Sequence, residues 1–249
     1  MKTLIVGLGN QGVKRKKYIN KDFIGSVDPL NKKADFKNIK NVDLSIYNSV
    51  LLCVPDSEKL ELIKYCLKNR KHVLVEKPLQ IKSSNLKEIY KISKKNNTIL
   101  YTAYNHRFEP HFKNVKNFLD NNSLGKFHFL KMFYGNGTSQ LVKKSNWKDR
   151  KMGVISDLGS HLLDSIDFFL NIRPNNFNLV SKNYLENKSP DHAVFIHKTK
   201  STLIHLEVSL CMWRNTFRCD LVFEKGSLHI DSLCKWGPSR LTIRKRKFP

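Results

Sequence analysis

The sequence predicts an α/β fold, in which a doubly wound parallel sheet is followed by an α+β domain with a mainly antiparallel sheet. Two observations carry this prediction. Over roughly the first hundred residues, short apolar runs alternate with segments of helical periodicity, as in βαβ units. Further along, apolar and polar residues alternate one by one, as in antiparallel strands with one solvated face. We therefore expect domains over residues 1–121 and 122–249.

The first strand and the turn after it open the predicted parallel domain. Residues 4–6 are apolar and indicate a strand that is buried on both faces. Three glycines follow with the spacing G-x-G-x-x-G: Gly7, Gly9 and Gly12. In a dinucleotide-binding turn they permit, in order, the tight turn, the approach of a pyrophosphate and close packing of the next helix. That helix opens around Asn10 and Gln11, so its free N–H groups would face the phosphates.

A second apolar run, "FIGSV", supports this interpretation. It ends at Asp28, which lies 21 residues after Gly7. A dinucleotide fold places at this point the acid that hydrogen-bonds the adenosine ribose. The strand, the glycines and the acid together predict a Rossmann-like domain. A carboxylate repels a 2′-phosphate, so we expect NAD as cofactor. NADP is the alternative, favoured by Lys32 and Lys33.

The alternation of strand and helix continues to the end of this domain. Residues 49–54 form the next apolar strand, which stops at Pro55. A helix with apolar residues at helical spacing follows, and then a strand that ends in Glu76, Lys77 and Pro78. A further helix runs to about residue 96, and "TILYTAY" returns as a strand.

The second half of the sequence has a different pattern of apolar residues. A helix is expected from about Pro110 to Asp120, and another from about Val154 to Leu170. The strands are expected in the alternating stretches "KFHFLKMFYGNG", "HAVFIHKTK", "STLIHLEVSL" and "TFRCDLVFEKGSLHI".

Composition limits the class of protein. A hydrophobic content of 40% and an aromatic content of 10% describe a globular chain. No stretch is long and apolar enough for a membrane span, and the N-terminus leaves no room for a signal peptide, so we expect a cytoplasmic protein. The net charge is +24, but lysines are spread throughout and no nucleic-acid-binding signature appears. Nucleic acid is therefore not the expected partner. The five cysteines have no C-x-x-C spacing, so neither a disulfide framework nor a metal site is predicted.

Two stretches contain candidate catalytic groups. Lys77 ends a parallel strand, and ligands of such sheets lie beyond the carboxyl ends of the strands. Asp157 and His161 are four residues apart, so on a helix they share one face. A carboxylate beside an imidazole fixes its tautomer and raises its proton affinity, which suits a general acid or base. The simpler alternatives are an exposed turn lysine and a helix-stabilising contact.

A third stretch, "YNHRFEPHF", follows the end of another strand. Tyr104, Asn105 and Arg107 offer donors and acceptors that suit a polyhydroxylated ligand. From the residues alone, this stretch is interpreted as a polar loop.

The motifs "GLGNQG", "HVLVEKPL", "YNHRF" and "DLGSHLLD" resemble, in this order, those of the glucose–fructose oxidoreductase / inositol dehydrogenase (Gfo/Idh/MocA) family. The resemblance implies a nicotinamide-dependent oxidoreductase that acts on CH–OH groups of sugars, cyclitols or nucleotide-sugars. It implies Lys77 as a catalytic lysine, His161 as the acid/base histidine with Asp157 as its partner, and a cis bond before Pro78.

The expected site and partners follow. The cofactor-binding residues are Gly7, Gly9, Asn10, Gln11, Gly12, Asp28, Pro55, Glu76 and Lys77, and the substrate-binding residues are Tyr104, Asn105 and Arg107. We expect a small sugar-like substrate and a homo-oligomer formed through the sheet of the second domain.

The sequence departs from the family pattern in three places. Glu58 or Lys59 follows "VPDS" where relatives often carry His, and the glycine run before the Asp-His helix is reduced to Gly153. Many relatives continue beyond the position of Pro249, which fits a fragment, a truncated gene product or a naturally short member.

The alternative function is a catalytically impaired NAD-binding or sensor protein. A nucleic-acid-binding module is favoured only by charge.

Overall fold

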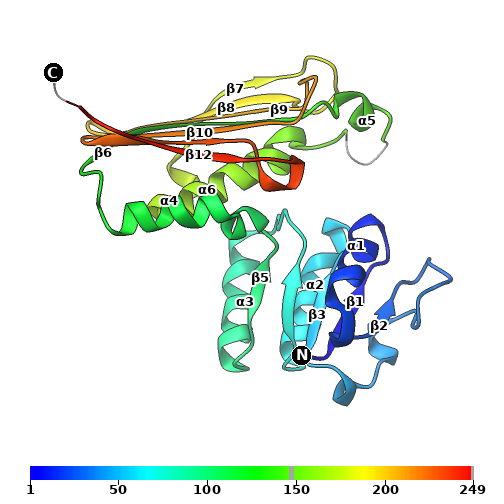
Figure 1. Ribbon diagram of the computed structural model, residues 1–249. Coiled ribbons are helices and arrows are strands. Elements are labelled where there is room, and N and C mark those ends of the chain that lie inside the picture. Colours follow the sequence, from blue (N-terminus) through cyan, green and yellow to red (C-terminus); the bar gives the residue numbers. More distant parts are fainter. Residues whose placement is uncertain (146–148, 248–249) are drawn as a thin grey trace. The chain divides into compact units, whose positions relative to one another are not determined.

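The computed structural model describes residues 1–145 and 149–247, and the chain forms two compact units, Met1–Ala103 and Tyr104–Pro249 (Figure 1). The sequence placed the boundary near residue 121. The structure places it before Tyr104, because Phe112 and Val115 of helix α4 (Pro110–Asp120) belong to the core of the second unit. The expectation about the end of the chain rests on Pro249, which lies outside the described residues.

The first unit is built on a five-stranded sheet in which every neighbouring pair is parallel, in the order β2-β1-β3-β4-β5. Its strands are β1 (Thr3–Val6), β2 (Phe23–Val27), β3 (Ser49–Leu52), β4 (His72–Val75) and β5 (Leu100–Thr102). The chain leaves β1 toward β2 on one side and returns to β3 on the other. The carboxyl ends of β1 and β3 therefore form the switch point where such sheets bind ligands.

Helices cover both faces of this sheet, as the sequence predicts (Figure 1). They are α1 (Asn10–Ile19), α2 (Asp56–Lys68) and α3 (Ser83–Lys95), with short 3₁₀ turns at Asn20–Asp22, Ile39–Asn41 and Leu44–Ile46. Successive residues of β1 belong to different apolar clusters. Leu4 lies in the cluster that includes Ile63 and Ile89 of α2 and α3, whereas Ile5 lies in the cluster against which Ile19 of α1 packs.

The second unit is built on a seven-stranded sheet in the order β12-β11-β10-β6-β9-β8-β7. Its strands are β6 (Phe127–Gly135), β7 (Asn178–Asn183), β8 (His192–Lys198), β9 (Leu203–Ser209), β10 (Thr216–Phe223), β11 (Gly226–Asp231) and β12 (Arg240–Lys245). All neighbours are antiparallel except β6 and β9. Helices α4 and α6 (Ser160–Leu170) lie on one face of the sheet (Figure 1).

Short helical segments complete the second unit. They are η4 (Asn105–Phe108), α5 (Ser139–Lys143), η5 (Ile155–Gly159), η6 (Pro174–Asn176) and η7 (Cys234–Trp236). The sequence predicted one α-helix over 154–170, but its first part, η5, is a π-helical turn. Apolar residues recur every three to four positions in both helix types, so the sequence pattern does not separate them. None of the described helices is long and apolar enough to cross a bilayer.

Candidate functional site

The glycine turn after β1 is shaped by two close backbone approaches. Gly7 has a φ of +92°, and a Cβ there would clash with the carbonyl group of Cys53 at the end of β3. A Cβ on Gly12 would clash with the carbonyl oxygen of Gly7. These two glycines are therefore required by the fold of the turn itself.

Gly9 differs from its two neighbours in the motif. Within the described part of the chain, and apart from Gly9 and its two neighbours in the sequence, no heavy atom lies within 4 Å of the position of a Cβ on this residue. Gly9 is the N-cap of α1, and Asn10 and Gln11 begin the helix with both residues exposed. The first N–H groups of a helix have no partner within it and lie at its positive end. Open space beside these groups fits the pyrophosphate of a dinucleotide.

Asp28 follows β2 and is bound to the glycine turn. Its Oδ2 accepts a hydrogen bond from the N–H of Leu8 at 2.8 Å, and its Oδ1 accepts from the N–H groups of Leu30 and Asn31, both at 2.9 Å. Burial raises the pKa of Asp28, but these amides and the charge of Lys37 outweigh it and hold the pKa below its ordinary value. The carboxylate is therefore ionised at neutral pH. Oδ2 keeps a second lone pair that a ribose hydroxyl can use.

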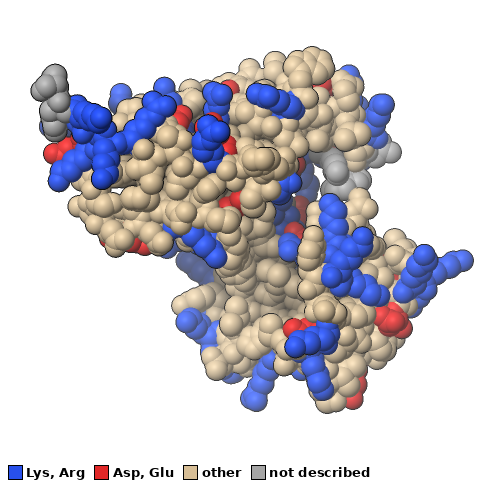
Figure 2. Space-filling model, viewed as in Figure 1, with Lys and Arg blue, Asp and Glu red and all other residues tan. Residues whose placement is uncertain are grey.

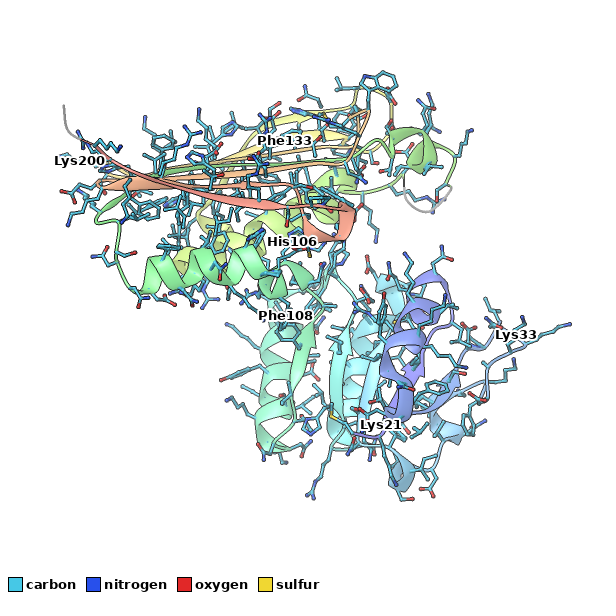
Figure 3. The ribbon with its side chains drawn as sticks, viewed as in Figure 1. Lys21, Lys33, His106, Phe108, Phe133 and Lys200 are labelled. Carbon is cyan, nitrogen blue, oxygen red and sulfur yellow. The ribbon has the colours of Figure 1, made fainter. Side chains whose placement is uncertain are left out.

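The two lysines that favour NADP lie behind this acid, and both are exposed. Lys33 extends away from the first unit in Figure 3. By contrast, Lys37 donates to the carbonyl oxygen of Asn31 at 2.8 Å and so supports the loop after Asp28.

The segment Glu76-Lys77-Pro78 follows β4, and its Lys77–Pro78 bond is cis, as the resemblance implies. Arg15 of α1 donates to Glu76 Oε1 from Nε and contacts the same oxygen with Nη2, both at 2.7 Å. This ion pair ties the segment to the helix of the dinucleotide turn. Lys77 is half-buried. Pro55, the N-cap of α2, follows β3 at the switch point.

Lys59 is a second support of this segment, and the sequence analysis gave it no role. Its side chain is almost completely buried, and Nζ donates to the carbonyl oxygen of Pro78 and pairs with Asp56 Oδ1, both at 2.7 Å. A signal for this burial is present in the sequence, because Lys59 precedes the buried residues Ile63 and Cys66 by four and seven positions. Lys59 therefore occupies the inner face of α2.

In the second unit, Tyr104 and His161 meet beside η4. The ring of Tyr104 lies edge-on to that of His161, with 5.8 Å between ring centres. Burial raises the pKa of Tyr104, although its hydrogen bond with Ser160 acts in the opposite direction. Asn105 is exposed on the same 3₁₀ turn. This part of the chain therefore brings a predicted substrate residue and the predicted acid/base together.

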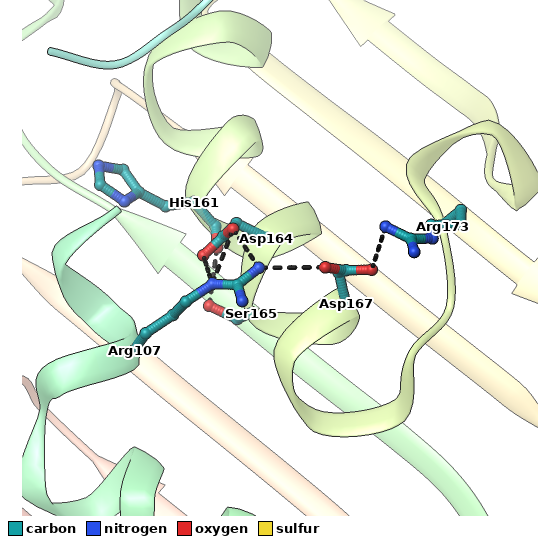
Figure 4. A network of polar contacts seen from close by, with 6 residues as sticks. All are labelled: Arg107, His161, Asp164, Ser165, Asp167 and Arg173. Atoms are coloured by element: carbon teal, nitrogen blue, oxygen red, sulfur yellow. Dashed lines mark hydrogen bonds and ion pairs between the residues drawn. The ribbon is translucent and has the colours of Figure 1, made fainter. Parts of the chain in front are cut away.

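Arg107 joins η4 to α6 through an ion-pair network (Figure 4). Its Nε donates to both oxygens of Asp164 at 3.0 and 2.9 Å, and its Nη2 reaches Asp164 at 2.6 Å and Asp167 at 3.1 Å. Arg173 pairs with Asp167 at 3.3 Å. Burial, together with the charge of Asp167, raises the pKa of Asp164 despite the opposing hydrogen bond and charge of Arg107. The guanidinium that the sequence assigned to the substrate thus also braces the helix that carries His161.

His161 is the second residue of α6 and is buried. Its carbonyl oxygen accepts a 2.7 Å hydrogen bond from Ser165 Oγ within the helix. Asp157 lies in the π-helical turn and is exposed. The charge of Asp157 contributes to raising the pKa of Tyr134, after the larger effect of burial.

His161 and Asp157 lie in the second unit, whereas Lys77 lies in the first. Across the described residues, no group of three His, Cys, Asp or Glu side chains is arranged to hold a metal ion.

A parallel sheet with a glycine turn at its switch point and an acid after β2 defines the class of dinucleotide-binding proteins. Within this class, the chain belongs to the Gfo/Idh/MocA family. Residues 1–104 match the family model described as "Oxidoreductase family, NAD-binding Rossmann fold", and residues 112–229 match the GFO/IDH/MocA C-terminal domain. The predicted family, fold class and NAD-binding domain are thereby confirmed.

Individual relatives act on polyols or bind nucleotide-sugars. Over 85 residues, the chain is 35% identical to myo-inositol 2-dehydrogenase of Thermotoga maritima, covering 34% of this chain and 25% of that protein. The WlbA dehydrogenase of Bordetella pertussis, solved with NADH and UDP-GlcNAcA, matches with a TM-score of 0.79 at 13% identity over 99% of this chain and 83% of that one. An inositol dehydrogenase homologue of Azotobacter vinelandii, solved with NADH and myo-inositol, gives 0.76 at 13% identity over 97% and 74%. The chain spans only part of its curated relatives: the match covers 25% of the length of this myo-inositol 2-dehydrogenase and 38% of the length of an uncharacterised oxidoreductase of Schizosaccharomyces pombe.

Proposed function

We propose that the protein transfers a hydride between NAD(H) and a secondary alcohol or ketone of a sugar, cyclitol or nucleotide-sugar. The observation that carries the proposal is the turn at Gly9, where open space adjoins both the start of α1 and the loop that Asp28 anchors. These features fit a dinucleotide. When bound, the nicotinamide supplies the hydride acceptor or donor.

The residues of the chain would handle the proton and the substrate oxygen. His161, or Lys77 through a relay, accepts the hydroxyl proton as the alcohol is oxidised. Proton transfer by a positioned group contributes about 10²–10⁴-fold to rate. Lys77 donates a hydrogen bond to the same oxygen and stabilises its developing negative charge. Asp157 orients His161, and Tyr104, Asn105 and Arg107 line the substrate pocket.

The substrate class is inferred from chemistry and from the relatives. Myo-inositol and UDP-GlcNAcA, named for the relatives, both carry secondary hydroxyls. A polyhydroxylated ring suits the amide, phenol and guanidinium groups that follow β5. The net charge of +24 also favours anionic substrates over neutral ones.

The test measures NADH formation with myo-inositol and with UDP-GlcNAcA, together with NADH binding by fluorescence. We expect Lys77→Ala and His161→Ala each to lower turnover at least ~10²-fold with little change in NADH affinity. Lys87→Ala and His128→Ala change exposed residues of the same types and serve as controls. Near-normal turnover in both site variants would contradict the mechanism. NADH binding without turnover of either compound would favour the sensor instead.

We also propose that a second copy of the chain covers the open face of the second sheet. Leu130, Met132 and Tyr134 of β6 belong to the core, so Phe129 and Phe133 alternate onto the opposite face. Phe129 pairs in register with Val222 and with Leu203. Phe133 pairs instead with Arg218 and Glu207, so among the described residues the apolar part of this face is the row around Phe129, where the proposed contact is centred.

A further inference from the structure

The ring of His106 packs directly against that of His161, the proposed acid/base. His106 lies on η4, is completely buried, and its ring is stacked on that of His161, with 4.4 Å between ring centres and 21° between ring planes. Figure 3 shows His106 on the side of the second sheet that the helices cover. The sequence analysis treated this histidine only as part of the motif "YNHRF".

The surroundings of His106 are aromatic. Phe112 of α4, Tyr134 of β6 and Phe217 of β10 pack against its ring, with ring centres 5.5, 5.5 and 6.0 Å away. His106 therefore fills the space between η4, α4 and the sheet, and its position is fixed by three separate elements.

The charged and titratable groups around the pair come from η4 and its caps, β6, η5, α6 and η7. Tyr104 of the η4 cap and Tyr134 of β6 face the ring of His161, and Lys235 of η7 donates to the Tyr134 hydroxyl at 3.0 Å. The negative charges of Asp157 on η5 and of Glu109 add to the effect of burial, which raises the pKa of Tyr134. The other charges nearby, Arg107 and Asp164, are paired with each other.

Two physical arguments give the stacked pair a role. The χ2 angle of a histidine is broadly distributed, so an imidazole needs neighbours to hold one orientation. The stacked ring of His106 and the nearly perpendicular ring of Tyr104 supply them. Two like charges at stacking distance also repel strongly in a buried site, so the pair carries at most one.

We propose that His106 is a positioning residue, whose stacked ring holds the imidazole of His161 in one orientation for proton transfer. The role rests on the proposed function of His161 as the acid/base. His106 itself touches neither substrate nor cofactor in this proposal. Its contribution is made through the shape and the aromatic face of the ring, so another aromatic ring is expected to replace it.

The first test uses NMR and needs no substrate. The ring-proton signals of His161 are assigned by their loss in His161→Gln, and are then recorded in His106→Phe and His106→Leu. A stacked ring shields protons above its face. We expect the signals of His161 to stay near their wild-type positions in the Phe variant and to move downfield in the Leu variant. Unchanged signals in the Leu variant would overturn the proposal.

The second test separates this role from the proposed function. With myo-inositol or UDP-GlcNAcA as substrate, we expect His106→Leu to lose between about tenfold and 10²-fold in kcat, with KM and NADH affinity unchanged. His106→Phe should restore most of this loss. Full kcat in His106→Leu beside a large loss in His161→Gln would overturn the positioning role alone. Full kcat in His161→Gln would overturn the proposed acid/base, and the positioning role with it. Equal losses in the Phe and Leu variants would also overturn the role of the stacked ring.

Discussion

At the scale of single residues, the three glycines of the dinucleotide turn separate into structural and ligand-facing positions. We predict that Gly9→Val abolishes NADH binding while the unfolding temperature stays near that of the wild type. The side chain would enter the open space beside the start of α1, where the pyrophosphate is expected. A fluorescence titration with NADH and a thermal melt measure the two effects.

Gly12→Ala is the matched control, because a Cβ there clashes with the carbonyl oxygen of Gly7. We expect this variant to lower the unfolding temperature as well as NADH affinity. Wild-type NADH affinity in Gly9→Val would place the cofactor elsewhere.

Asp28 carries the second residue-scale prediction, a preference for NADH over NADPH of tenfold or more. Like charges in contact cost a few kcal/mol at an effective dielectric of about 20, and each factor of ten in affinity corresponds to about 1.4 kcal/mol. The lowered pKa of Asp28 means that the carboxylate is charged when the cofactor binds. Comparing the two dissociation constants tests this, and tighter binding of NADPH would mean that Lys32 and Lys33 dominate.

The variant Asp28→Ser should narrow this preference, chiefly by improving NADPH binding. The same carboxylate anchors the N–H groups of Leu8, Leu30 and Asn31. A thermal melt of the variant therefore has to accompany the titrations, so that loss of the loop is not mistaken for a change of specificity.

The role of a residue was predictable from the sequence where backbone geometry fixes its position. Gly7 and Asp28 directly follow β1 and β2, Gly12 lies in the first turn of α1, and their roles in the turn follow from this spacing. The roles of Lys59 and Arg107 were not predictable, because each depends on a partner distant in the sequence. Lys59 reaches the carbonyl oxygen of Pro78, and Arg107 reaches Asp164.

At the scale of elements, Lys59 joins α2 to the segment after β4. We predict that Lys59→Met lowers the free energy of unfolding by about 1–3 kcal/mol, because it removes the donor to the carbonyl oxygen of Pro78. The control is Lys64→Met on the same helix. Lys64 pairs with Glu88 at 2.9 Å near the surface, and such pairs contribute about 0–1 kcal/mol. Urea unfolding measures both, and equal losses would show that the buried contact is not the stronger one.

The elements that the sequence did not predict are those with little burial. Strands β7 and β12 are the two edges of the second sheet, and most of their residues are exposed. An edge strand needs no regular apolar face, so the pattern that predicts central strands is absent there. The short helix α5 likewise has too few residues for its periodicity to be recognised.

At the scale of the whole molecule, sequence pattern predicts two bodies but not which of them α4 joins. Its apolar stripe would suit either core, and only the tertiary contacts of Phe112 and Val115 decide. The basic side chains are not confined to either unit. Figure 2 shows Lys and Arg side chains over both units on the face in view, which agrees with lysines spread along the sequence.

The last prediction concerns assembly through the open face of the second sheet. Light scattering after size exclusion should give at least twice the chain mass of 29.0 kDa for the wild type. We expect Phe129→Glu to shift this mass toward that of one chain, because it places a charge between Val222 and Leu203 on the face to be covered. Asn117→Glu is the control, because it adds the same charge at an exposed position of α4, on the face of the sheet that the helices cover. An oligomer that persists in Phe129→Glu, or a monomeric wild type, would show that this face is not the contact. Unchanged unfolding temperatures in both variants would confirm that the shift reports assembly and not loss of the fold.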